Sequence, residues 1–435
     1  MFFSAKKNLV IVLTIVCSTG IFGLDLTDLS YNLADKFYSL TGNYEGTTGF
    51  RSLLIPSGGR AESLGNAYTG LADDISYIDF NPAASSILEN TEISLFHNSW
   101  IADSAMETIA ATTRIKNLGL GGKISCFYVP FSEYDSFGTK SSSNYYTETT
   151  AVFNVSHNFH PGYIFKGLAV GSNIKFSWRG MPDYSDKTTG KTISGSGLEQ
   201  SALAFMADIG IITQFNFFKF YNSRESNCRA GVSFSNLGAA ITGFGGSIKF
   251  DDPLTTSAGI GFSYKPLRPL TFSFEFRQPF DISALDEYQF FYAGTGFCAD
   301  ITSYFSILCG FQLKGANPRF SLGSEFEIFK MRFNLNYSLD LTSSLNPVNR
   351  ISVSAKIKLG DKGRKEIRLK VDELYSYGLS LYADRKYDEA IIAWQEALKL
   401  DKYFDPAREA IEIASQYSSM LKLIQDLTDY NNEQE

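Results

Sequence analysis

Few side chains in this chain combine the residue types and the spacing that catalysis requires. The Gly-Lys-Thr run at residues 190–192 lacks the earlier glycine of a phosphate-binding loop, because Ser185 stands at that position. The only histidines are His97, His157 and His160. The last two flank a predicted turn beside aromatic strand ends, where a polar interfacial role fits better than catalysis. These residues predict a protein that is not an enzyme.

Two further candidates are also incomplete as chemical sites. Ser196 lacks the glycine two residues earlier that a nucleophile elbow needs. The adjacent carboxylates of Asp73 and Asp74 could bind a cation, but they belong to a longer motif considered below. We therefore expect no cofactor and no metal site.

Four cysteines follow the first twenty-five residues: Cys126, Cys228, Cys298 and Cys309. Their spacing fits no zinc pattern, and four are too few for a disulfide scaffold in a chain of this size. Cys298 and Cys309 could lie on neighbouring strands and form a disulfide. The role that fits all four better is that of small buried hydrophobic residues.

The composition restricts the class of protein. The 435 residues suggest about three structural parts. Aromatic residues make up 15%, charged residues only 20%, and the net charge is -7. These values exclude disorder and a long charged coiled coil, and the negative charge argues against nucleic-acid binding.

The first residues resemble a signal peptide. Lys6 and Lys7 precede the apolar run 9–16, and small residues at Gly20 and Gly23 suit cleavage. We expect a signal peptide at 1–23, with an anchoring helix or lipid attachment at Cys17 as alternatives. No later run of eighteen apolar residues indicates a membrane helix.

From about residue 91 to 360 the sequence alternates with a period of two. Apolar Leu335, Tyr337 and Leu339, for example, alternate with polar Asn336 and Ser338. Because successive strand side chains point to opposite faces, each such segment has one apolar and one polar face. We count fourteen segments, near 91–100, 105–116, 118–131, 145–159, 167–180, 198–217, 228–237, 255–265, 269–278, 288–298, 303–314, 319–330, 331–341 and 350–360.

The segments and their connectors indicate an all-β transmembrane barrel of about fourteen antiparallel strands. Several segments are long enough to cross a hydrocarbon layer when tilted. Tight connectors such as 314–318 contrast with polar loops at 132–144, 181–197 and 237–253, and aromatic residues cluster near strand ends. A water-soluble β-sandwich is the alternative, since its strands alternate too.

Before the strands lies a stretch rich in small residues. Residues 57–74 read SGGRAESLGNAYTGLADD, and residues 79–84 read DFNPAA. Small residues allow tight turns and close backbone approach, and Asn-Pro is a turn signal. An irregular surface loop is the plain alternative.

This ordered series resembles the FadL-type family of outer-membrane transporters for long-chain fatty acids and other hydrophobic compounds, including its spirochaetal (Treponema-type) paralogues. The resemblance covers roughly residues 50–360. It implies that residues 24–90 fold inside the lumen as an N-terminal hatch, and that residues 91–360 form the barrel. The implied hatch motif comprises Gly65, Ala67, Tyr68, Gly70, Asp73, Asp74, Asn81 and Pro82.

The resemblance implies passive uptake of a hydrophobic small molecule, fatty acid-like, through an apolar interior site. The alternatives are an outer-membrane barrel for protein secretion or assembly, because related hatch motifs occur in such barrels, and a surface adhesin whose long loops meet a host. The implied localisation is the outer membrane.

After residue 360 the spacing becomes helical. Residues 361–435 resemble one tetratricopeptide repeat followed by a third helix, with packing positions Leu374, Gly378, Leu381, Ala390, Trp394 and Ala397. Lys402 departs from the usual proline. An even strand count places the start of the first strand and the end of the last strand on the same side, the periplasm, so we expect a periplasmic module that binds a protein partner. A capped helical hairpin without a partner is the alternative.

Overall fold

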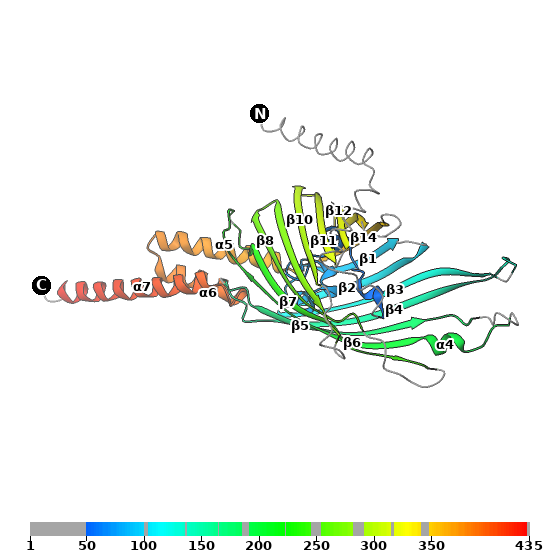
Figure 1. The fold of residues 1–435 in the computed structure, drawn as a ribbon. Helices are drawn as coiled ribbons and strands as arrows, with labels where there is room; N and C mark the ends of the chain where they lie inside the picture. Colours follow the sequence, from blue (N-terminus) through cyan, green and yellow to red (C-terminus); the bar gives the residue numbers. More distant parts are fainter. Residues whose placement is uncertain are drawn as a thin grey trace, which may run out of the picture.

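The computed structural model describes residues 49–99, 103–134, 137–163, 165–184, 191–221, 223–244, 254–281, 291–314, 317–340 and 348–432. The predicted signal peptide and residues 24–48 of the predicted hatch lie outside these residues. Figure 1 shows a barrel with helices projecting from one end.

Fourteen antiparallel strands form a closed barrel, as the alternation predicts. Each strand pairs with its neighbours in sequence, and β1 pairs with β14 from Thr91↔Gly360 to Ser99↔Ile351. The strands are β1 (Thr91–Ser99), β2 (Ala105–Ile115), β3 (Leu118–Tyr134), β4 (Lys140–Phe159), β5 (Leu168–Gly180), β6 (Ala202–Phe215), β7 (Cys228–Thr242), β8 (Ser257–Leu267), β9 (Leu270–Pro279), β10 (Tyr292–Thr302), β11 (Phe305–Lys314), β12 (Asn317–Ile328), β13 (Met331–Asp340) and β14 (Val348–Gly360).

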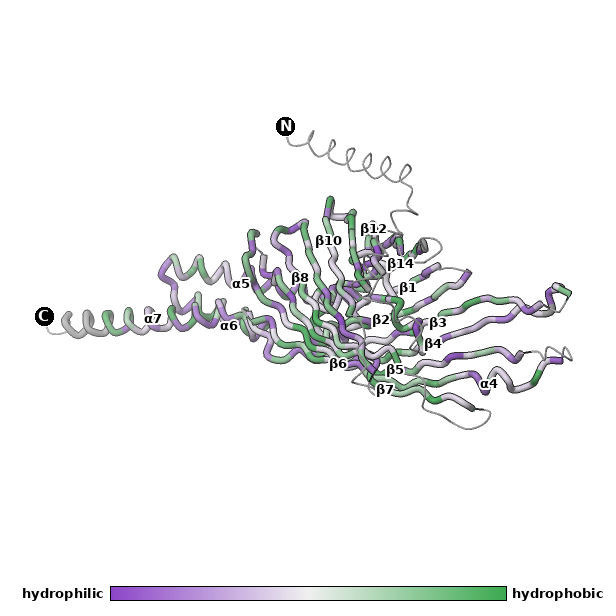
Figure 2. The backbone as a smooth tube through the Cα atoms, viewed as in Figure 1, coloured by the Kyte–Doolittle hydropathy of each residue, from purple (hydrophilic) through white to green (hydrophobic). Residues whose placement is uncertain are grey.

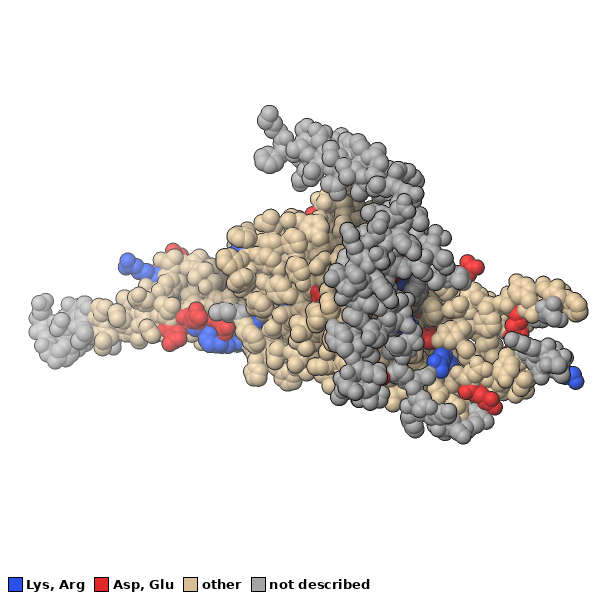
Figure 3. Space-filling model, viewed as in Figure 1, with Lys and Arg blue, Asp and Glu red and all other residues tan. Residues whose placement is uncertain are grey.

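The outer face of the barrel is apolar and the inner face is polar. On β13, Leu335 and Tyr337 are exposed, whereas Asn334, Asn336 and Ser338 are buried inside. Figure 2 shows the alternation of hydropathy along the strands, and Figure 3 shows that charged side chains are sparse along the barrel wall where it is not covered. Such a wall requires an apolar surrounding.

Three local expectations were wrong: the loop at 132–144, the strand start at 198, and the burial of all four cysteines, since Cys309 is exposed and Cys126 is only partly buried. The predicted loop at 132–144 is mostly strand, because β3 continues to Tyr134 and β4 begins at Lys140, which forms a long hairpin. Residues 198–200, predicted to begin a strand, belong instead to the short helix α4 (Ser196–Gln200). The possible disulfide is absent, because Cys298 pairs in register with Leu308 and Cys309 with Phe297. The two sulfurs therefore lie on opposite faces of the wall.

The barrel has two different ends. We call the end with the β2–β3, β4–β5, β6–β7, β8–β9, β10–β11 and β12–β13 connections the turn side, and the opposite end the loop side. Because the strand count is even, β1 begins and β14 ends on the turn side. The tight turn at 314–318 lies on the loop side.

Residues 49–90, here named the inner segment, contain short helices that lie inside the barrel. These are η1 (Arg51–Leu54), α3 (Gly59–Ser63), η2 (Ile75–Asp79) and η3 (Pro82–Ser86). The Asp74 side chain accepts from Ser76 N at the start of η2, and the Asn81 side chain accepts from Ala83 N at the start of η3. Most of this segment is buried.

Three helices follow the barrel and form the helical module: α5 (Arg364–Ala383), α6 (Tyr387–Leu400) and α7 (Asp405–Asn432). No helix in the described part of the chain is both long enough and apolar enough to span a membrane. The Asp361 carboxylate accepts from the backbone N–H groups of Lys365 (2.6 Å) and Gly363 (3.1 Å) just before and within the first turn of α5. These bonds lower the pKa of Asp361 below its ordinary value.

Candidate functional site: the filled lumen and its cavity

The inner segment fits the lumen because small residues face small residues. A Cβ atom added to Gly70 of the inner segment would overlap the backbone at Gly261 of β8, and one added to Gly261 would overlap Gly70. Gly65 has a φ of 62°, and a Cβ there would lie 2.6 Å from the carbonyl oxygen of Phe311. Only glycine satisfies both this conformation and this approach.

The motif carboxylates make ion pairs inside the barrel. Asp73 lies 2.9 Å from the Arg60 guanidinium, and Asp74 pairs with Lys356 on the inner face of β14. The Tyr68 hydroxyl lies 2.7 Å from Asp73 Oδ1 and 2.6 Å from Asp74 Oδ1. Protein cations and a hydroxyl thus contact both carboxylates, and this arrangement gives no support to a cation site.

Polar side chains and small residues fix the second half of the motif. Asn81 Nδ2 donates to Thr69 O (3.1 Å) and to Ile211 O of β6 (3.0 Å), so it joins two parts of the inner segment to the wall. Pro82 O accepts from Asn154 Nδ2 of β4 at 2.9 Å. Ala67 is buried beside Gly294 of β10. The structure therefore places all eight motif residues in the lumen.

Sequence reasoning missed further charged contacts between the inner segment and the wall. Arg60 also pairs with Glu325 of β12, and Asp79 pairs with Lys123 of β3. Ser352 Oγ of β14 donates to Glu62 Oε2 at 2.6 Å. The wall partners could have been found from the sequence, because a charged residue on the polar face of a barrel strand points into the lumen.

These ion pairs are buried, so each charge needs its partner. A buried charge without its partner costs about 3–5 kcal/mol, whereas the intact pair adds little net stability. The pairs therefore specify one position of the inner segment more than they strengthen it.

A cavity of about 180 Å³ remains on the loop side of the inner segment. Apolar Leu53, Leu54, Ile55 and Phe80 line one part. Charged side chains line the rest: Arg51, Asp79, Lys175, Glu275, Arg277, Arg319, Asp340 and Arg350. The resemblance implied an apolar interior site, but the lining of this cavity is part apolar and part charged.

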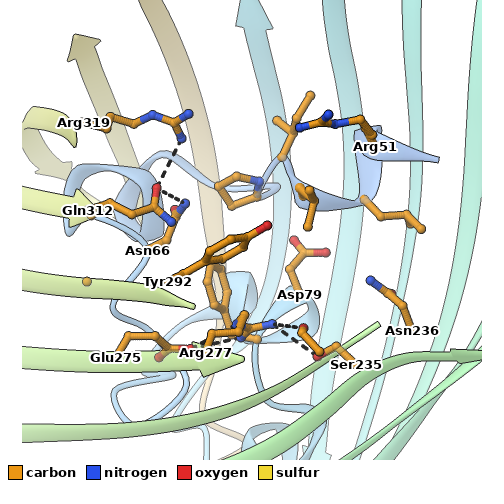
Figure 4. A pocket seen from close by; sticks show the side chains of 18 of the residues that line it. Arg51, Asn66, Asp79, Ser235, Asn236, Glu275, Arg277, Tyr292, Gln312 and Arg319 are labelled. Atoms are coloured by element: carbon orange, nitrogen blue, oxygen red, sulfur yellow. Dashed lines mark hydrogen bonds and ion pairs between the residues drawn. The ribbon is translucent and has the colours of Figure 1, made fainter. Parts of the chain in front are cut away.

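Most of the cavity charges are already paired, and Figure 4 shows the pair of Arg277 with Glu275 and the hydrogen bond of Arg319 to Gln312. Arg277 lies 3.0 Å from Glu275, Arg319 lies 2.8 Å from Asp340, and Lys175 lies 2.7 Å from Asp208. Within the described residues, Arg51 makes no ion pair or hydrogen bond through its guanidinium. Arg51 thus adds an unbalanced positive charge to the lining.

Tight packing holds the helical module together. Gly378, Leu381, Ala390, Trp394 and Ala397 are buried, and Leu374 packs at the edge of their cluster. A Cβ at position 378 would overlap the Trp394 indole, whose Nε1 donates to Tyr375 O at 3.1 Å. All six predicted packing residues thus lie between or beside the helices.

The helical module contacts the turn side of the barrel. Arg224 of the β6–β7 connection lies 2.6 Å from Asp372 of α5, and its guanidinium lies 4.8 Å from the ring centre of Phe404. Tyr163 of the β4–β5 connection meets Phe404 edge to face at 5.3 Å. Arg364 donates to the carbonyl oxygens of Arg114 (3.1 Å) and Glu89. The module is therefore attached at several places as well as through the chain.

Among the described residues, no group of three His, Cys, Asp or Glu side chains is arranged to hold a metal ion.

The family model of UPF0164, described as an uncharacterised protein family, matches residues 32–362, which is most of the chain. The chain belongs to the UPF0164 family. The matched residues end before α5.

UPF0164 relatives include proteins of Treponema pallidum (strain Nichols). One is 31% identical over 396 residues, which are 89% of this chain and 87% of the relative. Another is 27% identical over 402 residues, which are 88% of this chain and 78% of the relative. The expected kinship with Treponema paralogues is confirmed.

Three solved structures have a partly similar backbone. The Ralstonia pickettii toluene transporter TbuX has a TM-score of 0.46 and 12% identity, and covers 70% of this chain and 99% of its own. The CymD monoaromatic hydrocarbon channel has a TM-score of 0.48 and 11% identity, covering 71% and 98%. A FadL homologue of Pseudomonas aeruginosa has a TM-score of 0.40 and 11% identity, covering 70% and 98%. These TM-scores are below 0.5. The evidence for the barrel fold is therefore the strand pairing of this chain itself.

Proposed function

We propose that this protein is an outer-membrane channel for the passive uptake of hydrophobic small molecules, and that long-chain fatty acids fit it best. The observation that carries the proposal is the closed barrel with an apolar outer face and a filled lumen that keeps a cavity. The expected signal peptide supports export, and the apolar wall supports a place in a hydrocarbon layer. In this proposal the turn side faces the periplasm.

The lining of the cavity favours an amphiphile over a plain hydrocarbon. Leu53, Leu54 and Phe80 offer apolar contact, and Arg51 offers a cation with no partner among the described residues. A volume of 180 Å³ is small beside the ~300–1,000 Å³ of sites that enclose a drug-sized ligand. It suits a carboxylate and the first part of an acyl chain, while the rest extends towards the loop side.

In this proposal the inner segment acts as the hatch. Its motif glycines Gly65 and Gly70 meet the wall backbone directly, so a shift at these contacts displaces no side chain. The pairs of Arg60, Asp73 and Asp74 hold the closed position. Passage of a ligand then requires these pairs to exchange partners as the segment moves.

A test of the ligand class uses protein purified from its native membrane. Mass spectrometry of the small molecules extracted from the unmodified protein is expected to find fatty acids. Arg51→Gln should retain about tenfold less, since a hydrogen bond to a charged group contributes ~1.5–3 kcal/mol. Arg385→Gln, an exposed change in the helical module, serves as the control. Absence of any lipid from the natural protein would contradict the proposal.

A second candidate is a role in secretion or assembly, in which the helical module recruits a periplasmic protein. It is favoured by one observation: near its contact with α6 through Lys422 and Asp388, α7 exposes the large apolar side chains of Met420, Leu421, Leu423 and Ile424. Cross-linking of the full chain in cells should then join a partner to these positions, and replacing them with Ser should abolish the product. A product that persists in that variant, or that never forms, would contradict this role.

A further inference from the structure

The turn side of the barrel repeats one pairing of side chains at its rim. Three tight connections each place an exposed cation directly beside an exposed apolar side chain: Ile115–Lys116, Leu267–Arg268 and Phe329–Lys330. They belong to the β2–β3, β8–β9 and β12–β13 connections, so they are spread around the barrel. The pairing is therefore a property of the rim and not of one patch.

The apolar members of these pairs expose large hydrophobic side chains, which is unfavourable in water. Phe329 is 97% exposed, and Ile115 is 49% exposed. The β6–β7 connection adds Phe218 at 66% and Phe220 at 67%. Large apolar side chains at the ends of barrel strands are typical of the level where hydrocarbon meets lipid headgroups. Lys116, Arg268 and Lys330 then lie at the level of the headgroups.

The two ends of the barrel differ strongly in charge. Counted from the sequence, the segments between strands on the turn side carry six basic residues and one acidic residue. Those on the loop side carry three basic and ten acidic residues. The chain that follows β14 adds Lys362, Arg364, Lys365 and Arg368 to the turn side, against two acidic residues, Asp361 and Glu366. On the face shown in Figure 3, charged side chains gather towards the ends of the molecule.

We propose that the turn-side rim binds the headgroups of anionic phospholipids in the leaflet that it faces. The apolar member of each pair enters the hydrocarbon, and the flexible cation beside it reaches a lipid phosphate, as long basic side chains do at membrane surfaces. The acidic loop side repels the same headgroups. This difference gives the barrel a preferred orientation between two unlike leaflets. The inference depends on the membrane location in the proposed function but not on the transported molecule.

The test uses the full chain in nanodiscs with equal amounts of phosphatidylglycerol and phosphatidylcholine. Native mass spectrometry counts the lipids that stay bound after release. We expect the natural protein to retain mostly phosphatidylglycerol, and added salt to weaken this preference, since screening shortens the reach of exposed charges. Lys116→Gln with Lys330→Gln should lower the ratio of the two lipids, by up to about fivefold per lysine removed.

The matched control removes two exposed lysines from the loop side, Lys140→Gln with Lys191→Gln, and should leave the ratio unchanged. Equal retention of both lipids by the natural protein, or the same loss in both double variants, would overturn the inference. Phe329→Ala should lower retention of both lipids alike. A protein that retains no lipid at all would instead contradict its membrane location, so the two failures are distinguishable.

Discussion

At the scale of single residues, the contact between wall and inner segment depends on the absence of side chains as much as on their presence. Gly70 and Gly261 meet backbone to backbone, and Gly65 meets Phe311 in the same way. The sequence shows that these residues are small. It does not show which wall glycine meets which motif glycine, because that pairing follows from the register of distant strands.

Gly261→Ala tests this close contact. The added methyl group overlaps the Gly70 backbone, so we expect a loss of about 1–3 kcal/mol in the free energy of unfolding, or displacement of the inner segment. Proteolysis of the inner segment in the detergent-solubilised protein measures the displacement, and urea unfolding measures the stability.

The control for this change lies two residues away on the same face of β8. A Cβ at Gly259 would lie 3.3 Å from the ends of the Arg277, Glu275 and Ser233 side chains, which can give way. Gly259→Ala is therefore expected to cost less. Equal effects of the two substitutions would show that the contact with Gly70 has no special weight.

At the scale of elements, alternation located the strands well because one face of each strand is apolar and the other polar. It failed where that contrast is missing. The run at 140–144 is Lys-Ser-Ser-Ser-Asn, which resembles a loop, yet it pairs with β3 in a long hairpin. The start of β10 lies four residues later than predicted, and β7 continues to Thr242 through Gly and Ala residues that show no clear alternation.

The cavity was beyond prediction from sequence for a related reason. Arg51 precedes the motif, Arg277 lies on β9, and Arg350 lies on β14. Only closure of the barrel brings them together. Likewise, helical spacing identified the packing residues of the helical module, but not its contact with the barrel through Tyr163 and Arg224.

Arg224→Ala tests the attachment of the helical module. It removes the pair with Asp372, whose two side chains are partly exposed, and the contact with the buried Phe404 ring, so we expect a local loss of about 1 kcal/mol. Hydrogen exchange should rise in the connection at 160–167 and in the first turn of α7, while the barrel strands keep their protection. Arg385→Ala, far from this contact, is expected to change neither. A rise confined to α6, or none at all, would contradict the described attachment.

At the scale of the whole molecule, the barrel, the inner segment and the helical module each have a distinct place. The barrel provides an apolar outside and a polar inside, and the inner segment fills the lumen. The helical module lies on the turn side, where β1 begins and β14 ends. Arg364 of α5 donates to the carbonyl oxygen of Glu89, the last part of the inner segment before β1. The inner segment and the helical module therefore meet at the entry to the barrel wall.

If hydrophobic molecules cross this barrel, their uptake into proteoliposomes depends on the protein. The account predicts that a fluorescent long-chain fatty acid reaches the lumen of vesicles that contain the protein faster than it reaches protein-free vesicles, and that Arg51→Gln slows this uptake whereas Arg385→Gln does not. Equal rates with and without the protein would contradict the account.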